Sequence, residues 1–302
     1  MAKRVANEVL LPNQLTLLPP SKPLSPPLKW AGGKRWLVPL LFRLYAPFRH
    51  LRFAEPFVGG MSVSLGLSPS QALLADINVH LVNFYRHLQS GLQIGIALKN
   101  EAETYYRYRD RFNQLVRSNQ ADSKEAAELF YYLNRTGFNG LCRFNSKGEF
   151  NVPFGRYKKI NYVRDFTPYA AVVSRYTILA SDFRNFPLED SDFVYADPPY
   201  DVEFTEYSAG GFSFEDQEEL AVRLAKHSGP VLISNQATRR ILDLYSDLGF
   251  ELVYLLAPRR ISSNGDRTPA TEVLAAKDID NQLLHRSLSS FKYAVTDSKP
   301  VT

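Results

Sequence analysis

The sequence has little of what builds disulfides, metal sites or membrane spans. Cys142 is the single cysteine in 302 residues, so the chain can form neither a disulfide framework nor a cysteine-rich zinc site. The five histidines lack metal-ligand spacings such as HExxH. No apolar run approaches the roughly 18 residues of a membrane helix, and the N-terminus lacks an apolar signal core. These absences predict a soluble, cytoplasmic protein that uses no metal.

A strong excess of one charge is also missing. The formal net charge is +5, which suits an anionic partner without requiring one. The surplus is concentrated in one segment, where a single acid, Glu149, lies among six basic residues: Arg143, Lys147, Arg156, Lys158, Lys159 and Arg164. This segment alone is basic enough to carry the surplus of the whole chain.

Short apolar runs alternate with amphipathic helical patterns. We expect strands within residues 51–60, 72–78, 176–183, 192–200, 230–236, 250–258 and 271–277. Helical patterns cover residues 80–89, 213–227 and 238–249. This alternation predicts an α/β fold with a parallel, doubly wound sheet, where ligands bind beyond the carboxyl ends of the strands. Polar residues fall at those ends: Glu55, Asp76, Asp182, Asp197 and Asn235.

The alternation stops between residues 85 and 170. Helical patterns at 102–116 and 123–136 follow each other with no clear strand between them. We therefore predict a mainly helical insertion at 85–170 within a catalytic domain built from residues 28–84 and 171–278. Residues 1–27 contain six of the 19 prolines and are expected to form an arm, and residues 279–302 a C-terminal tail.

A glycine loop follows the first expected strand, in "FAEPFVGG" (53–60). Glycines at such a place let the backbone approach a ligand closely, although an ordinary tight turn has the same residues. Asp76 ends the next strand, 21 positions after Glu55, where an acid holds ribose hydroxyls in dinucleotide-type sites. Together the two features predict a cofactor that contains a nucleoside.

A second glycine pair lies in "KWAGGKRW" (29–36). Taken on its own, this stretch indicates a flexible basic loop before the first helix of the domain. Its alternative is a backbone clamp in which a lysine meets a carboxylate group.

The basic segment "LNRTGFNGLCRFNSKGEFNVPFGRYKK" (133–159) mixes arginine and asparagine with aromatic residues. Arginine pairs with guanine, asparagine with adenine and lysine with phosphate, and aromatic rings stack on bases. An ordinary solvated charged face lacks the interleaved rings of Phe144, Phe150, Phe154 and Tyr157. The pattern therefore favours contact with nucleic acid.

The stretch "DFVYADPPYD" (192–201) ends a buried strand in Asp-Pro-Pro-Tyr. The simplest interpretation is a rigid turn at the protein surface without a function in catalysis, because two consecutive prolines end a strand. Beside a cofactor loop, however, Asp197 and a fixed carbonyl can hold a planar amino group, and Tyr200 can stack on an extruded base. Such acceptors also stabilise the positive charge that develops on an attacking nitrogen, with no metal or cysteine nucleophile needed.

These motifs, with "LLADIN", "GFSFEDQ", "VLISN" and "RRISSNGDR" in the same order, closely resemble those of the Dam-type DNA adenine-N6 methyltransferases. The resemblance covers about residues 28–277, and this group of enzymes includes type II modification enzymes with the same motif order. It implies a Rossmann-like methyltransferase sheet with a helical target-recognition insertion. It also implies transfer of a methyl group from S-adenosylmethionine to N6 of an adenine flipped out of double-stranded DNA, within GATC or a closely related site.

The resemblance also implies site residues. By this resemblance, the catalytic residues are Asp197, Pro198, Pro199 and Tyr200. Cofactor contacts fall on Trp30, Lys34, Glu55, Phe57, Gly59, Asp76, Asp182, Phe183 and Asp197. Base reading and intercalation fall on Lys29, Phe138, Asn139, Leu141, Arg143, Pro153 and Tyr157, and phosphate contacts on Arg135, Asn145 and Arg156. We expect a monomer that acts on DNA in the cytoplasm.

Two positions depart from the family pattern. Met61 replaces the third glycine or small residue that is usual in the cofactor loop, and Phe138 replaces a tyrosine of some members. Segments 202–211 and 259–267 are either loops that move over the flipped base or plain surface loops. The rival functions are methylation of cytosine N4 or of RNA, and a DNA-binding module without catalysis.

Overall fold

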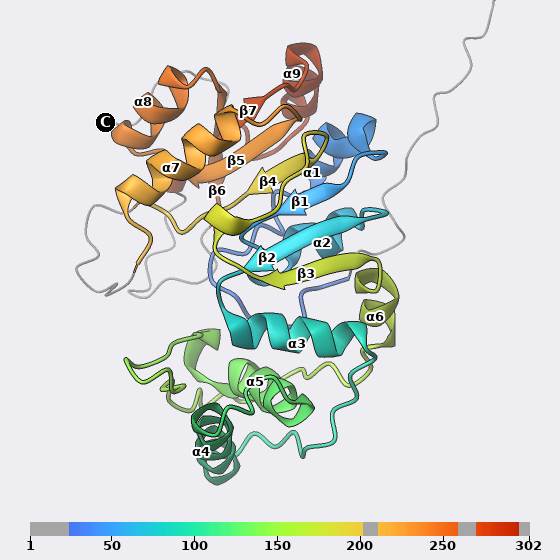
Figure 1. Ribbon diagram of the computed structural model, residues 1–302, viewed down its shortest axis with the longest axis vertical. Coiled ribbons are helices and arrows are strands. Elements are labelled where there is room, and N and C mark those ends of the chain that lie inside the picture. Colours follow the sequence, from blue (N-terminus) through green and yellow to red (C-terminus); the bar gives the residue numbers. More distant parts are fainter. Residues whose placement is uncertain (1–23, 202–210, 259–269, 296–302) are drawn as a thin grey trace, which may run out of the picture.

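Within residues 24–201, 211–258 and 270–295, the ranges that the computed structural model describes, seven strands form one sheet (Figure 1). Their order in the sheet is β3-β2-β1-β4-β5-β7-β6. The strands are β1 (Phe53–Glu55), β2 (Ala72–Asp76), β3 (Tyr176–Ala180), β4 (Phe193–Ala196), β5 (Val231–Gln236), β6 (Glu251–Ala257) and β7 (Ala270–Lys277). All seven lie within or next to the runs expected from the sequence.

Strand direction differs from the expectation at one edge. The pairs among β1 to β5 are parallel, but β7 runs antiparallel to both β5 and β6. The prediction of a parallel sheet is therefore wrong for β7. The physical reason is that a continuous apolar run indicates a buried strand but carries no information about its direction.

Residues alternate between two buried clusters along each strand. Phe53, Leu74 and Tyr195 face one cluster, and their neighbours Ala54 and Leu73 face the other. Helices α7 (Phe214–Ala225) and α8 (Arg239–Asp247) cover the second face. The first face is covered by α1 (Val38–Tyr45), α2 (Ser62–Leu67), α3 (Val79–Gln89), α6 (Thr167–Val173) and α9 (Asn281–Ser289). The sheet is thus doubly wound, as predicted.

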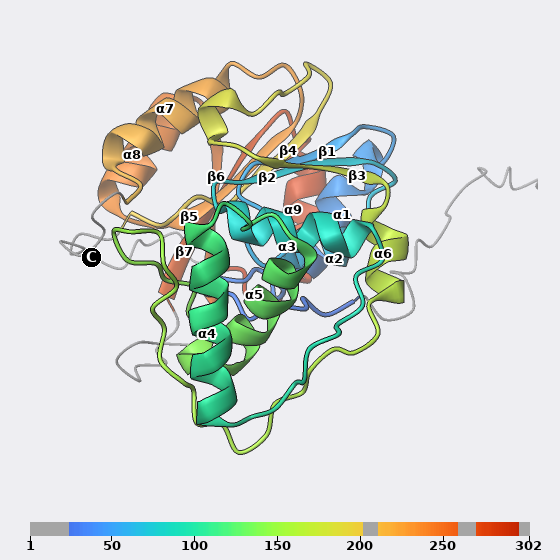
Figure 2. The ribbon, with the colours of Figure 1, turned by 60° about the horizontal axis from the view of Figure 1, so that its bottom comes forward.

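The chain between α3 and α6 lies beyond the sheet. It contains α4 (Ala102–Arg117) and α5 (Lys124–Thr136), followed by a segment in which the 3-10 turn Phe138–Gly140 is the main regular element. Helix α3 lies between the sheet and α5, so it joins the two parts (Figures 1 and 2). The expected limits at 85 and 170 fall inside α3 and α6.

Several helices begin where a polar side chain caps them. Asn78 accepts hydrogen bonds from two amides of α3, and Ser123 and Thr238 cap α5 and α8 in the same way. Ser213 and Asp216 form a capping box at the start of α7. The cap at Asp280 starts α9 inside the segment expected to be a tail, and this helix packs against α1.

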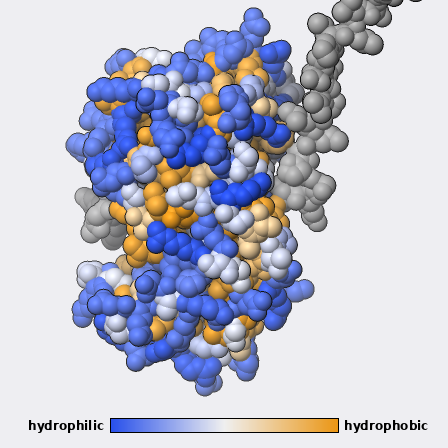
Figure 3. Space-filling view, turned by 45° about the vertical axis from the view of Figure 1, so that its right-hand side comes forward, coloured by the Kyte–Doolittle hydropathy of each residue, from blue (hydrophilic) through white to orange (hydrophobic). Residues whose placement is uncertain are grey.

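Hydrophilic residues cover most of the face shown in Figure 3, as expected when the apolar side chains gather in two buried clusters. None of the helices in the described ranges combines the length and hydrophobicity needed to cross a bilayer. In the same ranges, no three His, Cys, Asp or Glu side chains are grouped so as to hold a metal ion. The segments 202–210 and 259–267, and the arm up to residue 23, lie outside the described residues.

Candidate active site

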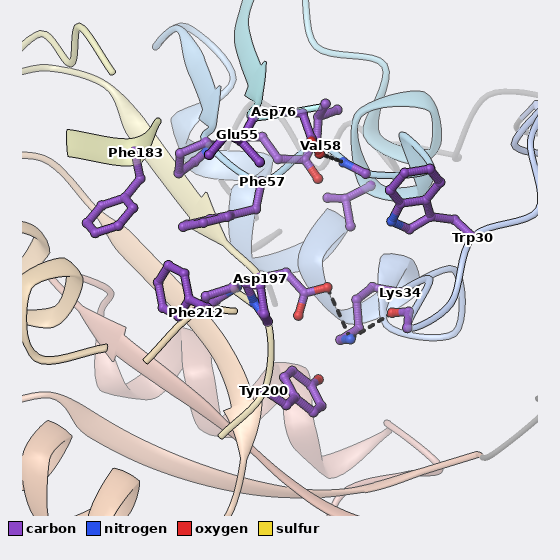
Figure 4. A pocket seen from close by; sticks show the side chains of 18 of the residues that line it. Trp30, Lys34, Glu55, Phe57, Val58, Asp76, Phe183, Asp197, Tyr200 and Phe212 are labelled. Carbon is purple, nitrogen blue, oxygen red and sulfur yellow. Dashed lines mark hydrogen bonds and ion pairs between the residues drawn. The ribbon is translucent and has the colours of Figure 1, made fainter. Parts of the chain in front are cut away.

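A cavity of about 830 Å³ opens beyond the carboxyl ends of β1, β2, β3 and β4 (Figure 4). Every residue that the sequence predicts for cofactor binding or catalysis lines it: Trp30, Lys34, Glu55, Phe57, Gly59, Asp76, Asp182, Phe183, Asp197, Pro198, Pro199 and Tyr200. Parallel strands end at the same edge of a sheet, so strand-end residues from distant parts of the chain meet there.

The loop after β1 is built around glycines. Gly59 has a φ of 44°, and its amide donates a hydrogen bond to Oδ2 of Asp76 at 3.0 Å. Trp30 packs on Gly59 and Gly60, where an added Cβ would lie 2.7 Å from the nearest Trp30 atom. Larger residues at these positions would displace the tryptophan. Met61 follows with a φ of 58°; it is fully buried and does not line the cavity.

Asp76, at the end of β2, is held by backbone amides. Its Oδ1 accepts from the amide of Asn78 at 2.9 Å, while Oδ2 accepts from Gly59. Burial raises the pKa of Asp76, and the two amide hydrogen bonds oppose that rise. The carboxylate is therefore fixed next to the glycine loop, the place where the sequence predicts ribose binding.

Glu55 is a buried acid in the same cavity, with 2% of its surface exposed. Burial raises its pKa to about 8, a hydrogen bond from Ser64 lowers it, and the charges of Asp197 and Asp76 raise it. At neutral pH this side chain therefore retains its proton in the free protein.

Three phenylalanines form an apolar wall. The ring centroid of Phe57 lies 5.8 Å from that of Phe183 and 5.6 Å from that of Phe212, and the last two are 5.4 Å apart. Beside them, Asp182 accepts a hydrogen bond from the amide of Arg184, whose guanidinium pairs with Asp182, Asp216 and Glu219. The wall and the carboxylate suit a flat heterocycle with an amino group.

Asp197 is held by donors from two distant elements. The ammonium of Lys34 lies 3.1 Å from its Oδ2 (Figure 4). The hydroxyl of Ser234 on β5 donates to its Oδ1 at 2.8 Å. Burial raises the pKa of Asp197, and Lys34 and Ser234 lower it. The Lys34 ammonium also lies 4.6 Å from the ring centroid of Tyr200. Lys34 of the "KWAGGK" loop thus contacts a carboxylate of the protein itself, and the backbone clamp expected of this loop stays a prediction.

A second cavity of about 260 Å³ adjoins the first. The two share Trp30, Gly32, Gly33 and Tyr200. Tyr200 therefore borders both cavities.

The predicted DNA-binding residues lie apart from the cavity, around the segment that follows α5. Phe138, Asn139, Leu141, Arg143, Pro153 and Arg156 are exposed, and Lys29, Arg135, Asn145 and Tyr157 are partly buried. Residues 143–151 form a hairpin-like turn through the Phe144–Phe150 bridge and the hydrogen bonds around it.

Some of these side chains bind the protein itself. The amide of Asn145 pairs with Glu149 and the backbone of its own turn. Arg135 donates to the carbonyl of Asn161, and Arg143 to Oδ1 of Asn151. Lys29 donates to the carbonyl of Arg135 at 2.8 Å and lies over the Tyr157 ring; burial and Arg135 lower its pKa to about 8.

Sequence reasoning missed Phe212 and Ser234 as site residues. They lie in the motifs "GFSFEDQ" and "VLISN", but the residue types alone do not show that Phe212 lines the cavity or that Ser234 contacts Asp197. The available signal for Ser234 was its place near the carboxyl end of β5, which pairs with β4; Phe212, just before α7, offered no such signal.

Comparisons with known proteins agree with this geometry. The model of a family described as D12 class N6 adenine-specific DNA methyltransferase matches residues 30–261. The chain is 40% identical over 269 residues to a DNA adenine methylase of Vibrio cholerae, covering 82% of this chain and 94% of that protein. It is 37% identical over 272 residues to the DNA adenine methylase of Escherichia coli K12, covering 82% and 93%. It is 34% identical over 270 residues to the Retron Ec67 DNA adenine methylase of Escherichia coli, covering 83% and 91%. The chain therefore belongs to the D12 class of N6 adenine-specific DNA methyltransferases.

Proposed function

We propose that this protein binds S-adenosylmethionine in the 830 Å³ cavity and methylates N6 of an adenine flipped out of duplex DNA, within GATC or a closely related site. The observation that carries the proposal is the position of Asp197. Its carboxylate is fixed by Lys34 and Ser234 on the wall of a cavity that also contains a glycine loop and a strand-end acid.

The lining of the cavity fits this cofactor. Asp76 would hold the ribose hydroxyls, and the wall of Phe57, Phe183 and Phe212 would enclose the adenine, with Asp182 at its amino group. Glu55 would face a cationic group of the methionine part. When bound, S-adenosylmethionine supplies a methyl group on a positively charged sulfur.

The Asp-Pro-Pro-Tyr turn would orient the substrate. The Asp197 carboxylate accepts one N–H of the exocyclic amine, and the carbonyl of Pro198 accepts the other, so the nitrogen lone pair points at the methyl group. Both acceptors stabilise the positive charge that develops on the nitrogen during transfer. Tyr200 stacks on the extruded base.

Residues 85–170 would recognise the target sequence. Their exposed Arg143, Asn139 and Phe138 suit base reading and wedging, and Arg156 suits phosphate contact. We further propose a monomer that acts on cytoplasmic DNA without a metal ion. Mass measurement in solution tests the monomer, and methylation in excess EDTA tests the independence from metal.

The test begins with the product. Purified protein is incubated with tritium-labelled S-adenosylmethionine and with defined DNA duplexes or RNA, and the methylated nucleoside is identified. N6-methyladenine in DNA supports the proposal, whereas N4-methylcytosine or methylated RNA would replace it with a rival function. Sequencing of DNA from cells that express the protein then gives the methylated site. Methylation outside GATC-like sites would contradict the proposed target.

The residue assignment is tested with Asp197→Ala. This variant should lose methylation while it remains folded at the temperature of the assay. Asp247→Ala, at an exposed position on α8, is the matched control and should remain active. Turnover by Asp197→Ala at the wild-type rate would remove Asp197 from the mechanism. Calorimetry with S-adenosylmethionine separates a catalytic defect from a silent DNA-binding module, which would not bind the cofactor.

A further inference from the structure

Two buried carboxamides lie behind the Asp-Pro-Pro-Tyr turn. Gln217 belongs to α7 and Asn235 to the last residues of β5, with 1% and 0% of their surfaces exposed. A buried carboxamide needs hydrogen-bond partners for both its NH₂ group and its oxygen. The groups that it hydrogen-bonds to therefore show which parts of the structure it holds in place.

The two side chains form a relay that brackets Tyr200. Nε2 of Gln217 donates to the carbonyl of Pro199 at 2.7 Å, and Nδ2 of Asn235 donates to Oε1 of Gln217 at 3.0 Å. On the other side of the tyrosine, the amide of Asp201 donates to Oδ1 of Asn235 at 3.5 Å. The carbonyl immediately before Tyr200 and the amide immediately after it are therefore both hydrogen-bonded to this pair of side chains.

The relay is itself anchored. Nδ2 of Asn235 also donates to the hydroxyl of Tyr245 on α8 at 3.1 Å. The Asp201 carboxylate accepts from Thr238 at 3.0 Å and pairs with Arg240. Three elements, α7, β5 and α8, thus converge on a turn of only a few residues.

The turn needs this outside support because it cannot support itself. Parallel pairing between β4 and β5 ends at Ala196 and Ile233, and neither Pro198 nor Pro199 has an amide hydrogen to extend it. With no ladder hydrogen bond beyond that point, side chains must fix the path of the backbone.

We propose that Gln217 and Asn235 are positioning residues for methyl transfer, which act through the turn by fixing the backbone on both sides of Tyr200. The proposal rests on the catalytic role proposed for Asp197–Tyr200. Neither side chain lines the cavity, so neither touches the reacting atoms. Their removal should lower the rate of transfer rather than the binding of cofactor or DNA.

The main test replaces Gln217 with groups of similar size. Gln217→Leu can neither donate to Pro199 nor accept from Asn235. Its single-turnover rate with saturating cofactor and GATC duplex should fall about tenfold or more, since small misplacements are costly in an oriented reaction. Its dissociation constants for both ligands should stay within about threefold of the wild type.

Gln217→Glu adds a readout that a merely structural role would not move. A protonated carboxyl group can donate to Pro199 and accept from Asn235, whereas a carboxylate places a second acceptor against the Pro199 carbonyl. The charged and titratable groups around it come from the turn, α7 and α8: Asp197, Tyr200, Asp201, Asp216, Arg240 and Tyr245. The single-turnover rate of this variant, divided by that of the wild type at each pH, should therefore rise as the pH falls.

Glu218→Gln is the matched control, because Glu218 is the exposed neighbour of Gln217 on α7. It should keep the wild-type rate and pH profile. Three results would overturn the proposal: Gln217 variants within about twofold of the wild-type rate, equal losses in rate and in both binding constants, or a flat pH ratio for Gln217→Glu. Wild-type protein that methylates no adenine would instead refute the proposed function.

Discussion

The ammonium of Lys34 lies 3.1 Å from Oδ2 of Asp197, although one residue precedes the first helix and the other follows the fourth strand. Lys34 also donates to the carbonyl of Gly32 at 2.8 Å, so the loop before α1 is shaped around this contact. Strand β4 and the loop that carries Trp30 are therefore joined inside the cavity.

Removing the cation should change the pH dependence of the reaction. Lys34 lowers the pKa of Asp197, which burial raises, so Lys34→Met leaves Asp197 with a higher pKa. Protonation removes the negative charge of Asp197 that stabilises the positive charge developing on the adenine nitrogen, so activity is lost as pH falls through that pKa. We expect a methylation rate at least about tenfold lower and an acid limb displaced to higher pH. Rate profiles measured with Lys226→Met, at an exposed lysine, serve as the control. An acid limb that does not move would contradict the role given to this contact.

Glu55 should couple cofactor binding to proton release. Its pKa of about 8 means that the free protein keeps this proton at neutral pH. A cationic ligand favours the carboxylate, lowers that pKa and expels the proton, so affinity should rise with pH up to about 8, by at most about tenfold per pH unit. Calorimetry in buffers with different ionisation enthalpies measures the released protons. Glu55→Gln should abolish this release; equal proton release by both proteins would assign it to another group.

Much of this site could be read from the sequence because its information is local. Asp76 and Asp197 end apolar runs, and both lie where the runs indicated. The pairing of Lys34 with Asp197, the direction of β7 and the helix α9 could not be read, since each depends on contacts between distant segments. Periodicity reports which residues are buried but not what they are buried against.

Phe212 illustrates the same limit and gives a direct test. Its ring closes the wall formed by Phe57 and Phe183, and an alanine there opens it. We expect Phe212→Ala to weaken S-adenosylmethionine binding by about 1–2 kcal/mol, roughly 5- to 30-fold, with Phe212→Leu between it and the wild type. Calorimetric titration of the three proteins tests this order. Wild-type affinity in the alanine variant would place the cofactor elsewhere in the cavity.

Arg143 should carry part of the sequence choice. Its guanidinium is exposed and held toward one side by Oδ1 of Asn151 at 2.8 Å. If it pairs with a guanine, Arg143→Ala should reduce discrimination between GATC and single-substitution duplexes by about 1–3 kcal/mol. Competition methylation assays at fixed salt measure this, with Arg239→Ala on α8 as the exposed control. An unchanged preference would show that other residues read the site.

Asn134 should matter to the cofactor site although it lies outside the cavity. Its fully buried amide accepts from the amide of Lys29 and donates to the carbonyl of Lys29, both at 2.8 Å, and so ties α5 to the segment that carries Trp30 and Lys34. Asn134→Ala leaves two backbone groups unpaired and should lower the free energy of unfolding by about 1–3 kcal/mol. Because the freed segment lines the cavity, S-adenosylmethionine affinity should fall as well.

Denaturant unfolding measures the stability of Asn134→Ala and calorimetry measures its cofactor affinity, each against Gln120→Ala as an exposed control. Loss of stability with unchanged cofactor affinity would show that the Trp30 segment is positioned without Asn134.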